Sequence, residues 1–134
     1  MANLKDCSKF NTHDDYYTPK WVFERFNHLI PKDKTIWEMC LLNSNEQSKK
    51  YLTELGNKVI GSNKCDCLKK TKYEKECDMI ISNIPYDKKI KIPILKKLAE
   101  LDKPFMIIMN TTNFHSNYFQ EIFEGKDLYF LIKL

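Results

Sequence analysis

The sequence predicts an α/β fold with a doubly wound, mostly parallel sheet of about five strands. Two observations indicate this fold class. Short apolar runs that are rich in β-branched residues recur along the chain, and such runs are typical of strands buried in parallel sheets. Segments with a helical spacing of apolar residues separate them, and this alternation favours βαβ units. The runs predicted as strands are residues 35–39, 58–62, 78–82, 104–109 and 128–134.

The first two predicted helices have recognisable end signals. Thr18 is a suitable N-cap with a proline after it, and Pro31 ends the apolar stripe that follows. Ser44 and Gln47 have the spacing of a capping box at the start of the second helix. Gly56 is placed to end that helix as a left-handed C-cap.

Two further helices are predicted in the second half of the chain. One begins at Pro93, because proline favours the first helical turn, and it runs to Leu101 with its apolar residues on one face. The other is a short helix over residues 118–123. Both lie between predicted strands, as the α/β alternation requires.

The length of 134 residues predicts a single domain, residues 1–134, because two domains of half this size would each lack a sufficient core. The polar residues 1–15 are expected to be flexible. Within the sheet, we expect strands 35–39 and 78–82 to be adjacent and 128–134 to lie toward an edge.

The composition narrows the classes of partner. The net charge of +4 suits a polyanion, but Arg25 is the only arginine, which disfavours bidentate readout of guanine edges. No apolar run approaches the roughly 18 residues that a membrane span needs, so we expect an intracellular protein without membrane contact. The five cysteines lack framework spacing, and Cys65 and Cys67 lack further ligands nearby, so we expect reduced thiols and no metal site.

The clearest candidate site follows the predicted strand 78–82. The chain leaves this strand through Asn83, Ile84, Pro85 and Tyr86. In parallel sheets, ligands bind beyond the carboxyl ends of the strands, near the point where the strand order reverses. Asn and Pro are also common in turns that merely end a strand, so position alone leaves both interpretations open.

The stretch "SNIPY" (82–86) resembles the Asn-Pro-Pro-Tyr motif of the amino-methyltransferases that act on adenine N6. Other segments follow the order of this family: residues 16–26 are similar to its N-terminal cofactor segment, 36–45 to its first strand and loop, and 55–63 to its second strand. The chain most resembles small adenine-methyltransferase-like proteins of large DNA viruses. The resemblance implies a Rossmann-like methyltransferase fold without the terminal strand pair, located in the cytoplasm or nucleus of a host cell or in a virion.

The resemblance implies a catalytic role for the motif. In the family, the Asn side-chain oxygen and the next carbonyl accept the two hydrogens of the adenine amine, which localises its lone pair for attack on the methyl sulfonium. The aromatic residue stacks on a base taken out of its helix. These roles fall on Asn83, the Ile84 carbonyl and Tyr86, with Pro85 between the last two. Ile84 replaces the first proline, which makes the turn less rigid.

The same resemblance implies a site for S-adenosylmethionine. The residues of this cofactor site match the family less well than the Asn-Pro-Pro-Tyr motif does. The residues that correspond in position are Tyr17, Thr18, Glu38, Asn63 and Asp66. Leu42 and Ser44 stand where the family has glycines that let the backbone approach the cofactor. Asn63 stands where an acid accepts hydrogen bonds from the ribose, so charge-assisted strength is lost. We therefore expect little or no cofactor binding.

Two hypotheses of different classes follow. The favoured one is a non-catalytic descendant of the fold that binds nucleic acid or a protein partner, forms a homodimer or is structural, and needs no cofactor. The alternative is an active enzyme that transfers a methyl group from S-adenosylmethionine to adenine N6 in DNA or RNA. Lys88, Lys89 and Lys91 follow the motif and are candidates for contacts to nucleic-acid phosphates, with a solvated surface as the alternative.

Overall fold

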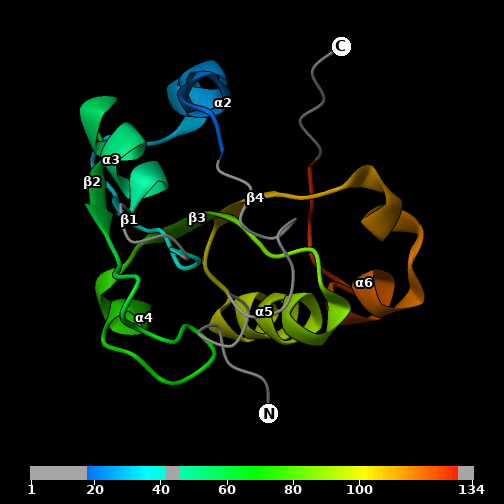
Figure 1. Ribbon diagram of the computed structural model, residues 1–134. Helices are drawn as coiled ribbons and strands as arrows, with labels where there is room; N and C mark the ends of the chain where they lie inside the picture. Colours follow the sequence, from blue (N-terminus) through cyan, green and yellow to red (C-terminus); the bar gives the residue numbers. More distant parts are fainter. Residues whose placement is uncertain (1–17, 42–45, 130–134) are drawn as a thin grey trace.

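The sheet of this protein is entirely parallel. The structure, a computed structural model, describes residues 18–41 and 46–129. It is a mixed α/β fold with a four-stranded sheet in the order β2-β1-β3-β4, flanked by helices (Figure 1). The strands are β1 (Thr35–Trp37), β2 (Lys58–Ile60), β3 (Met79–Asn83) and β4 (Phe105–Ile108). The predicted α/β class with a parallel sheet is thus confirmed.

Helices lie on both faces of the sheet. The helices are α2 (Lys20–Phe26), α3 (Gln47–Glu54), α4 (Tyr73–Glu76), α5 (Lys88–Leu101) and α6 (Asn117–Ile122), with 3₁₀ turns η2 (Asn27–Leu29) and η3 (Thr111–His115). Helices α2 and α3 lie on one side of the sheet in Figure 1, and α4, α5 and α6 lie on the other. None of the helices within the described ranges combines the length and apolar character that a membrane crossing requires.

The strand order creates a switch point at the centre of the sheet. β1 pairs with β2 on one side and with β3 on the other, and Ile36 lies opposite Met79. The predicted adjacency of these two strands is confirmed. The fifth predicted strand, 128–134, is not seen at residues 128–129, and its remainder lies outside the described residues, as do residues 1–15.

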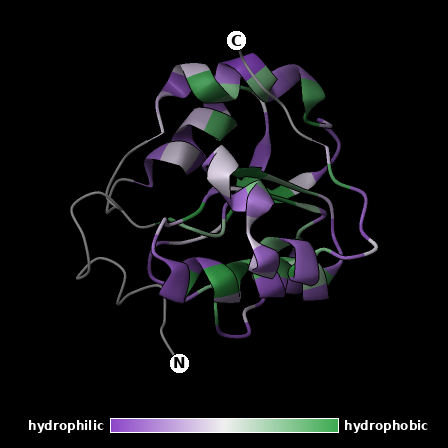
Figure 2. Ribbon diagram, turned by 90° about the vertical axis from the view of Figure 1, so that its right-hand side faces the viewer, coloured by the Kyte–Doolittle hydropathy of each residue, from purple (hydrophilic) through white to green (hydrophobic). Residues whose placement is uncertain are grey.

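Alternate side chains of the central strands belong to two separate hydrophobic cores, one on each face of the sheet. Ile36, Met79 and Ile81 pack with residues of α2 and α3, whereas Trp37 and Ile80 pack with α5 and α6. This alternation follows from the two-residue period of a strand. Figure 2 shows the apolar strands between helical layers of mixed polarity, so the sheet is buried on both faces.

Helix α5 begins five residues before the predicted start at Pro93. Asp87 caps it, because its side-chain carboxylate accepts a hydrogen bond from the backbone N–H of Lys89. Pro93 lies inside the helix, where it removes one backbone hydrogen bond. The fully buried Ile90 extends the apolar stripe of Ile94 by one more turn, and this burial offsets the lost bond.

The ends of the first two helices differ in part from the prediction. Pro19 occupies the N-cap position of α2, and Thr18 does not cap the helix; its hydroxyl faces the end of β3 instead. Ser44 lies outside the described residues, and Glu46 stands at the N-cap of α3 with a φ of 47°. Gly56 follows α3 with a φ of 92°, so the predicted left-handed ending is confirmed.

Lys97 of α5 anchors the long segment that connects β2 to α4. Its Nζ donates to the carbonyls of Cys67 and Lys69, at 2.5 and 2.7 Å, and it forms an ion pair with Glu74. All three partners belong to a stretch that is rich in lysine and poor in apolar residues. The ammonium group therefore holds this stretch against α5 in place of a hydrophobic contact.

Replacing Lys97 with methionine should lower the free energy of unfolding by about 2 kcal/mol, because charged hydrogen bonds are lost while the apolar stem is kept. We also expect faster proteolysis within residues 61–72. Lys96→Met on the exposed side of α5 is the matched control and should change stability by less than about 0.5 kcal/mol. Urea unfolding that gives equal midpoints for the two variants would contradict the anchoring role.

Candidate functional site

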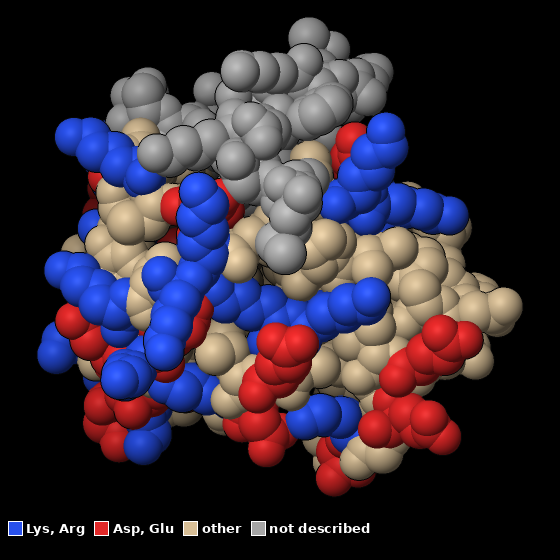
Figure 3. Space-filling model, turned by 90° about the horizontal axis from the view of Figure 1, so that it is seen from below, with Lys and Arg blue, Asp and Glu red and all other residues tan. Residues whose placement is uncertain are grey.

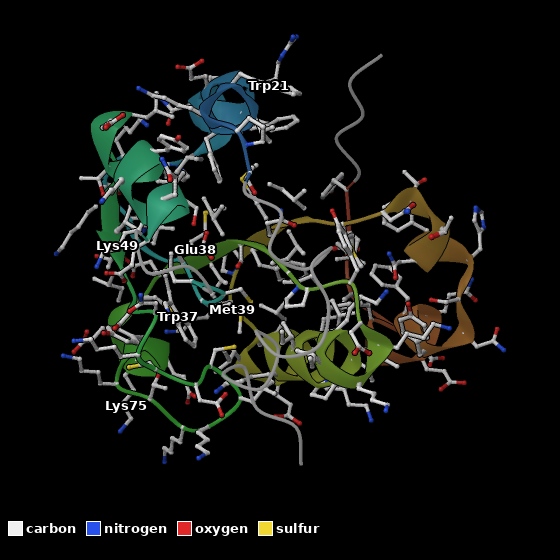
Figure 4. All side chains as sticks on the ribbon, viewed as in Figure 1. Trp21, Trp37, Glu38, Met39, Lys49 and Lys75 are labelled. Carbon is white, nitrogen blue, oxygen red and sulfur yellow. The ribbon has the colours of Figure 1, made fainter. Side chains whose placement is uncertain are left out.

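The candidate site lies at the carboxyl ends of β1 and β3, at the switch point of the sheet. Glu38 follows β1 directly, and Ser82 and Asn83 end β3. The Ser82 hydroxyl donates to Glu38 Oε1 at 2.5 Å, and the backbone N–H of Cys40 lies 3.1 Å from the same oxygen. Figure 4 places Glu38 in the interior, between α3 and the end of β3. The two strand ends are thus joined by a buried carboxyl group.

The electrostatics of Glu38 are unusual for a glutamate. Its side chain is 1% exposed, and this burial raises its pKa to about 7 even though hydrogen bonds from Ser82 and Cys40 and the nearby Ser48 hydroxyl lower it. Within the described part of the chain, Glu38 Oε2 has no hydrogen-bond partner. The carboxyl group therefore changes protonation near neutral pH and retains one oxygen for a further donor.

Asn83 is held from the opposite end of the sequence. Its Nδ2 donates to Thr18 Oγ1 at 2.8 Å, and Thr18 is buried. Because the amide nitrogen is occupied in this way, the amide oxygen is on the other side of the group. The structure thus brings together Thr18 and Asn83, two predicted site residues that are 65 positions apart.

The turn after Asn83 combines a buried anchor with an exposed aromatic ring. Ile84 is 2% exposed and packs in the α5 core, and Pro85 is buried as well. Tyr86 is 44% exposed, and Asp87 then caps α5. The buried Ile84 side chain and the helix cap therefore hold the turn that a second proline stiffens in the family motif.

The other predicted cofactor residues lie in the segment after β2. The backbone N–H of Asn63 donates to Glu46 Oε2 at 3.2 Å, which links this segment to the start of α3. Asp66 is buried, and its Oδ1 accepts from the backbone N–H of Leu68 at 3.0 Å. Tyr17, Leu42 and Ser44 lie outside the described residues.

The backbones of β1 and β2 approach each other closely beside Glu38. A Cβ at Gly61 would lie 2.5 Å from the Glu38 carbonyl oxygen and 3.3 Å from a methyl group of Leu41. Met39, Cys40 and Leu41, which follow Glu38, are all buried. Apolar side chains therefore fill the start of the loop that leaves β1.

Sequence analysis missed two residues of this site, Ser82 and Gly61. A serine inside the otherwise apolar run 78–82 was a visible signal, because a buried hydroxyl needs a partner. Gly61 ends a strand, where glycine often marks a close backbone approach. Neither signal identifies Glu38 as the group that each of them contacts.

The three lysines proposed for phosphate contacts have different environments. Lys88 and Lys89 are exposed, whereas Lys91 is only 7% exposed. The Nζ atoms of Lys88 and Lys91 each lie 5.7 Å from the ring centroid of Tyr118, a distance typical of cation–π contacts. Figure 3 shows basic side chains mixed with acidic ones on the face seen from below rather than a continuous basic surface.

Neither a metal site nor a known relative can be assigned to the described part of the chain. Within residues 18–41 and 46–129, no three His, Cys, Asp or Glu side chains gather as metal ligands would. Comparisons with protein-family models, with curated proteins and with solved structures find no match to this chain.

Proposed function

We propose that this chain is an adenine-N6 methyltransferase-like protein that binds nucleic acid and has lost methyl transfer. The observation that carries the proposal is the Asn83 amide, fixed by Thr18 at the switch point, with the exposed Tyr86 ring three residues further on. Ligands of parallel sheets bind at this point. The parallel strand order around it is compatible with the Rossmann-like fold of such methyltransferases.

The chemistry of the motif suits an unpaired adenine. An amide oxygen and the following carbonyl are two acceptors for the two hydrogens of an exocyclic amine. An exposed tyrosine ring offers a stacking surface to the same base, and such stacking contributes about 1–3 kcal/mol per base. Lys88 and Lys89 are exposed beside the motif and suit the flanking phosphates, with a salt-sensitive and weakly selective contribution.

The residues at the positions of the family's cofactor site support the loss of catalysis. Glu38 is buried, and one of its oxygens is occupied by Ser82 and Cys40. Met39 and Leu41 are buried apolar residues just before Leu42, the first of the two positions where the family has glycines. Neutral Asn63 stands in the place of the acid that binds ribose in the family, so hydrogen bonds to the ribose hydroxyls would lack the strength that a negative charge adds.

The second candidate function is an active S-adenosylmethionine-dependent adenine-N6 methyltransferase. The observation that favours it is Glu38 Oε2, a buried acceptor without a hydrogen-bond partner in the described residues, at the family's cofactor position. A bound cofactor that donates to this oxygen would satisfy it. For either candidate, the resemblance points to a location inside a host cell, in its cytoplasm or nucleus, or in a virion.

Thermal unfolding with S-adenosylmethionine separates the two candidates. At about 1 mM ligand we expect no shift of the melting midpoint, whereas a dissociation constant of about 10 μM would stabilise the protein by roughly 2.7 kcal/mol. Methionine at the same concentration is the control for unspecific effects. A clear shift that Glu38→Gln abolishes would overturn the loss of cofactor binding and establish the enzyme as the better hypothesis.

A further inference from the structure

Two lysines of α5 share the ring of one tyrosine of α6. The Nζ atoms of Lys88 and Lys91 each lie 5.7 Å from the ring centroid of Tyr118. Residues three positions apart lie on the same face of a helix, so both ammonium groups face α6, which packs beside α5 (Figure 1). The ring therefore brings two positive charges together at the junction of the two helices.

The tyrosine is itself fixed by hydrogen bonds. Its hydroxyl donates to Asn113 Oδ1 at 2.6 Å, and the buried Asn113 donates from Nδ2 to the carbonyl of Asn110 at 2.7 Å. Burial raises the pKa of Tyr118, but the Ser116 hydroxyl and the two nearby ammonium groups outweigh this effect and lower it. Because the phenol proton is directed to Asn113, the phenol oxygen is left to accept from Lys91.

The two positive charges lack an anion. Lys91 is only 7% exposed, and within the described residues no ion pair joins Lys88 or Lys91 to a carboxylate. A buried lysine is normally paired, and like charges one helical turn apart repel each other. By contrast, Lys97 and Lys103 each donate to two backbone carbonyls. An external anion between Lys88 and Lys91 would therefore satisfy both ammonium groups at once.

We propose that Lys88 and Lys91 bind the dianionic phosphate group of a phosphomonoester, with Tyr118 as the residue that positions both ammonium groups. Such a group carries about 1.5–2 negative charges near neutral pH, which matches two ammonium groups without an acid. A phosphodiester of a nucleic-acid backbone carries only one charge. The site therefore differs from the backbone contacts of the proposed function, leaves Lys89 outside, and does not require base binding. Terminal phosphates of nucleic acids and small phosphate esters share this chemistry.

Titrations with methyl phosphate and dimethyl phosphate, followed by NMR shifts of backbone amides in α5 and α6, test the site. Neither ligand contains a base, so the outcome is independent of the proposed adenine site. Near neutral pH we expect wild type to bind methyl phosphate about tenfold more tightly, because only the monoester offers a second charge to the second ammonium group. Equal affinities of the two ligands, or no saturable binding of methyl phosphate, would overturn the proposal.

Oligothymidine strands distinguish the two sources of a phosphomonoester. The strands carry a phosphate at the 5′ end, at the 3′ end or at neither. Tighter binding of one phosphorylated strand, by about tenfold and dependent on Lys91, would support the site and assign it to nucleic-acid ends. Equal binding of all three strands, with methyl phosphate binding retained, would support the site and assign it to a small phosphate ester.

Tyr118→Phe keeps the ring and removes the oxygen that accepts from Lys91. We expect the preference for methyl phosphate over dimethyl phosphate to fall to about threefold, because one hydrogen bond no longer fixes the Lys91 ammonium group. A purely structural effect would weaken the binding of both ligands equally, and this result would overturn the positioning role of Tyr118.

Lys91→Met removes the charge and keeps the apolar stem. Its preference for methyl phosphate should fall to about threefold, since the remaining ammonium group still favours the more highly charged ligand. Lys88→Met, at an exposed position, should show the same fall without a change in the core. Lys89→Met, also exposed, is the matched control and should keep the tenfold preference. A preference as large as that of wild type in Lys88→Met and Lys91→Met would overturn the proposal, and so would an equal fall in Lys89→Met.

Discussion

Replacing Glu38 with glutamine is expected to stabilise the protein by about 3 kcal/mol at pH 8. Burial raises the pKa of Glu38 to about 7 in the folded protein, from 4.5 as its ordinary value. Between these values the folded state holds a proton that the unfolded state has released, so stability falls as pH rises from 4.5 to 7. Each pKa unit corresponds to about 1.4 kcal/mol, and glutamine avoids the cost of a buried charge while keeping an acceptor for Ser82.

Urea unfolding at several pH values between 4 and 8 checks this expectation. The wild type should lose stability across the window, and Glu38→Gln should lose much less. The other two carboxylates with resolved shifts, Glu74 and Asp102, have lowered pKa values in the folded protein, so they cannot cause a loss of stability as pH rises. Glu100→Gln, at an exposed position of α5, is the control and should follow the wild type. Parallel curves for wild type and Glu38→Gln would contradict the raised pKa.

Gly61→Ala is expected to destabilise the protein by about 3–5 kcal/mol, the second large effect. Gly61 has a φ of 137°, a conformation that costs a residue with a side chain about 1–3 kcal/mol. The new methyl group would also lie 2.5 Å from the Glu38 carbonyl oxygen, and crowding of this kind costs about 1–3 kcal/mol more. The β1 and β2 ends would have to separate to make room.

Gly125→Ala separates the two causes. Gly125 also has a positive φ, 76°, but a Cβ there meets no heavy atom within 4 Å. We expect this control to cost only about 1 kcal/mol, the penalty of the backbone conformation alone. The free energies of unfolding are measured by denaturant unfolding. If both variants lose similar amounts, the close approach of the segment after β2 to Glu38 does not contribute to the cost of Gly61→Ala.

The strands were predictable because their side chains are apolar on both faces. Residues 35–39 and 78–82 stand out as buried runs, and their adjacency follows from the topology of parallel sheets. The start of α5 was not predictable from Pro93, because the capping side chain of Asp87 and the burial of Ile90 outweigh the proline signal. Helix α4 was missed because its four residues carry no apolar period.

The site was predictable in position but not in its contacts. Glu38 and Asn83 follow strand patterns that are local in sequence, whereas the bond from Asn83 to Thr18 spans 65 residues and leaves no local signal. The burial of Lys91 was equally hidden, because charge predicts exposure unless a partner such as the Tyr118 ring is known.

The most direct test of the proposed base site is equilibrium binding of a single-stranded oligonucleotide with one central adenine. The reference ligand carries purine, which lacks the exocyclic amine, at that position. The titrations compare wild type with Asn83→Ala, with Asn117→Ala at an exposed position of α6 as the control. A thermal melt of each variant confirms that it is folded.

At about 0.7 kcal/mol each, two hydrogen bonds to the amine are worth about 1.4 kcal/mol together, which corresponds to a tenfold preference for adenine over purine. The account predicts this preference in wild type and Asn117→Ala. In Asn83→Ala it should fall to about threefold, because only the hydrogen bond to the Ile84 carbonyl is left. Equal binding of the two oligonucleotides by wild type, or a preference in Asn83→Ala as large as that of wild type, would contradict it.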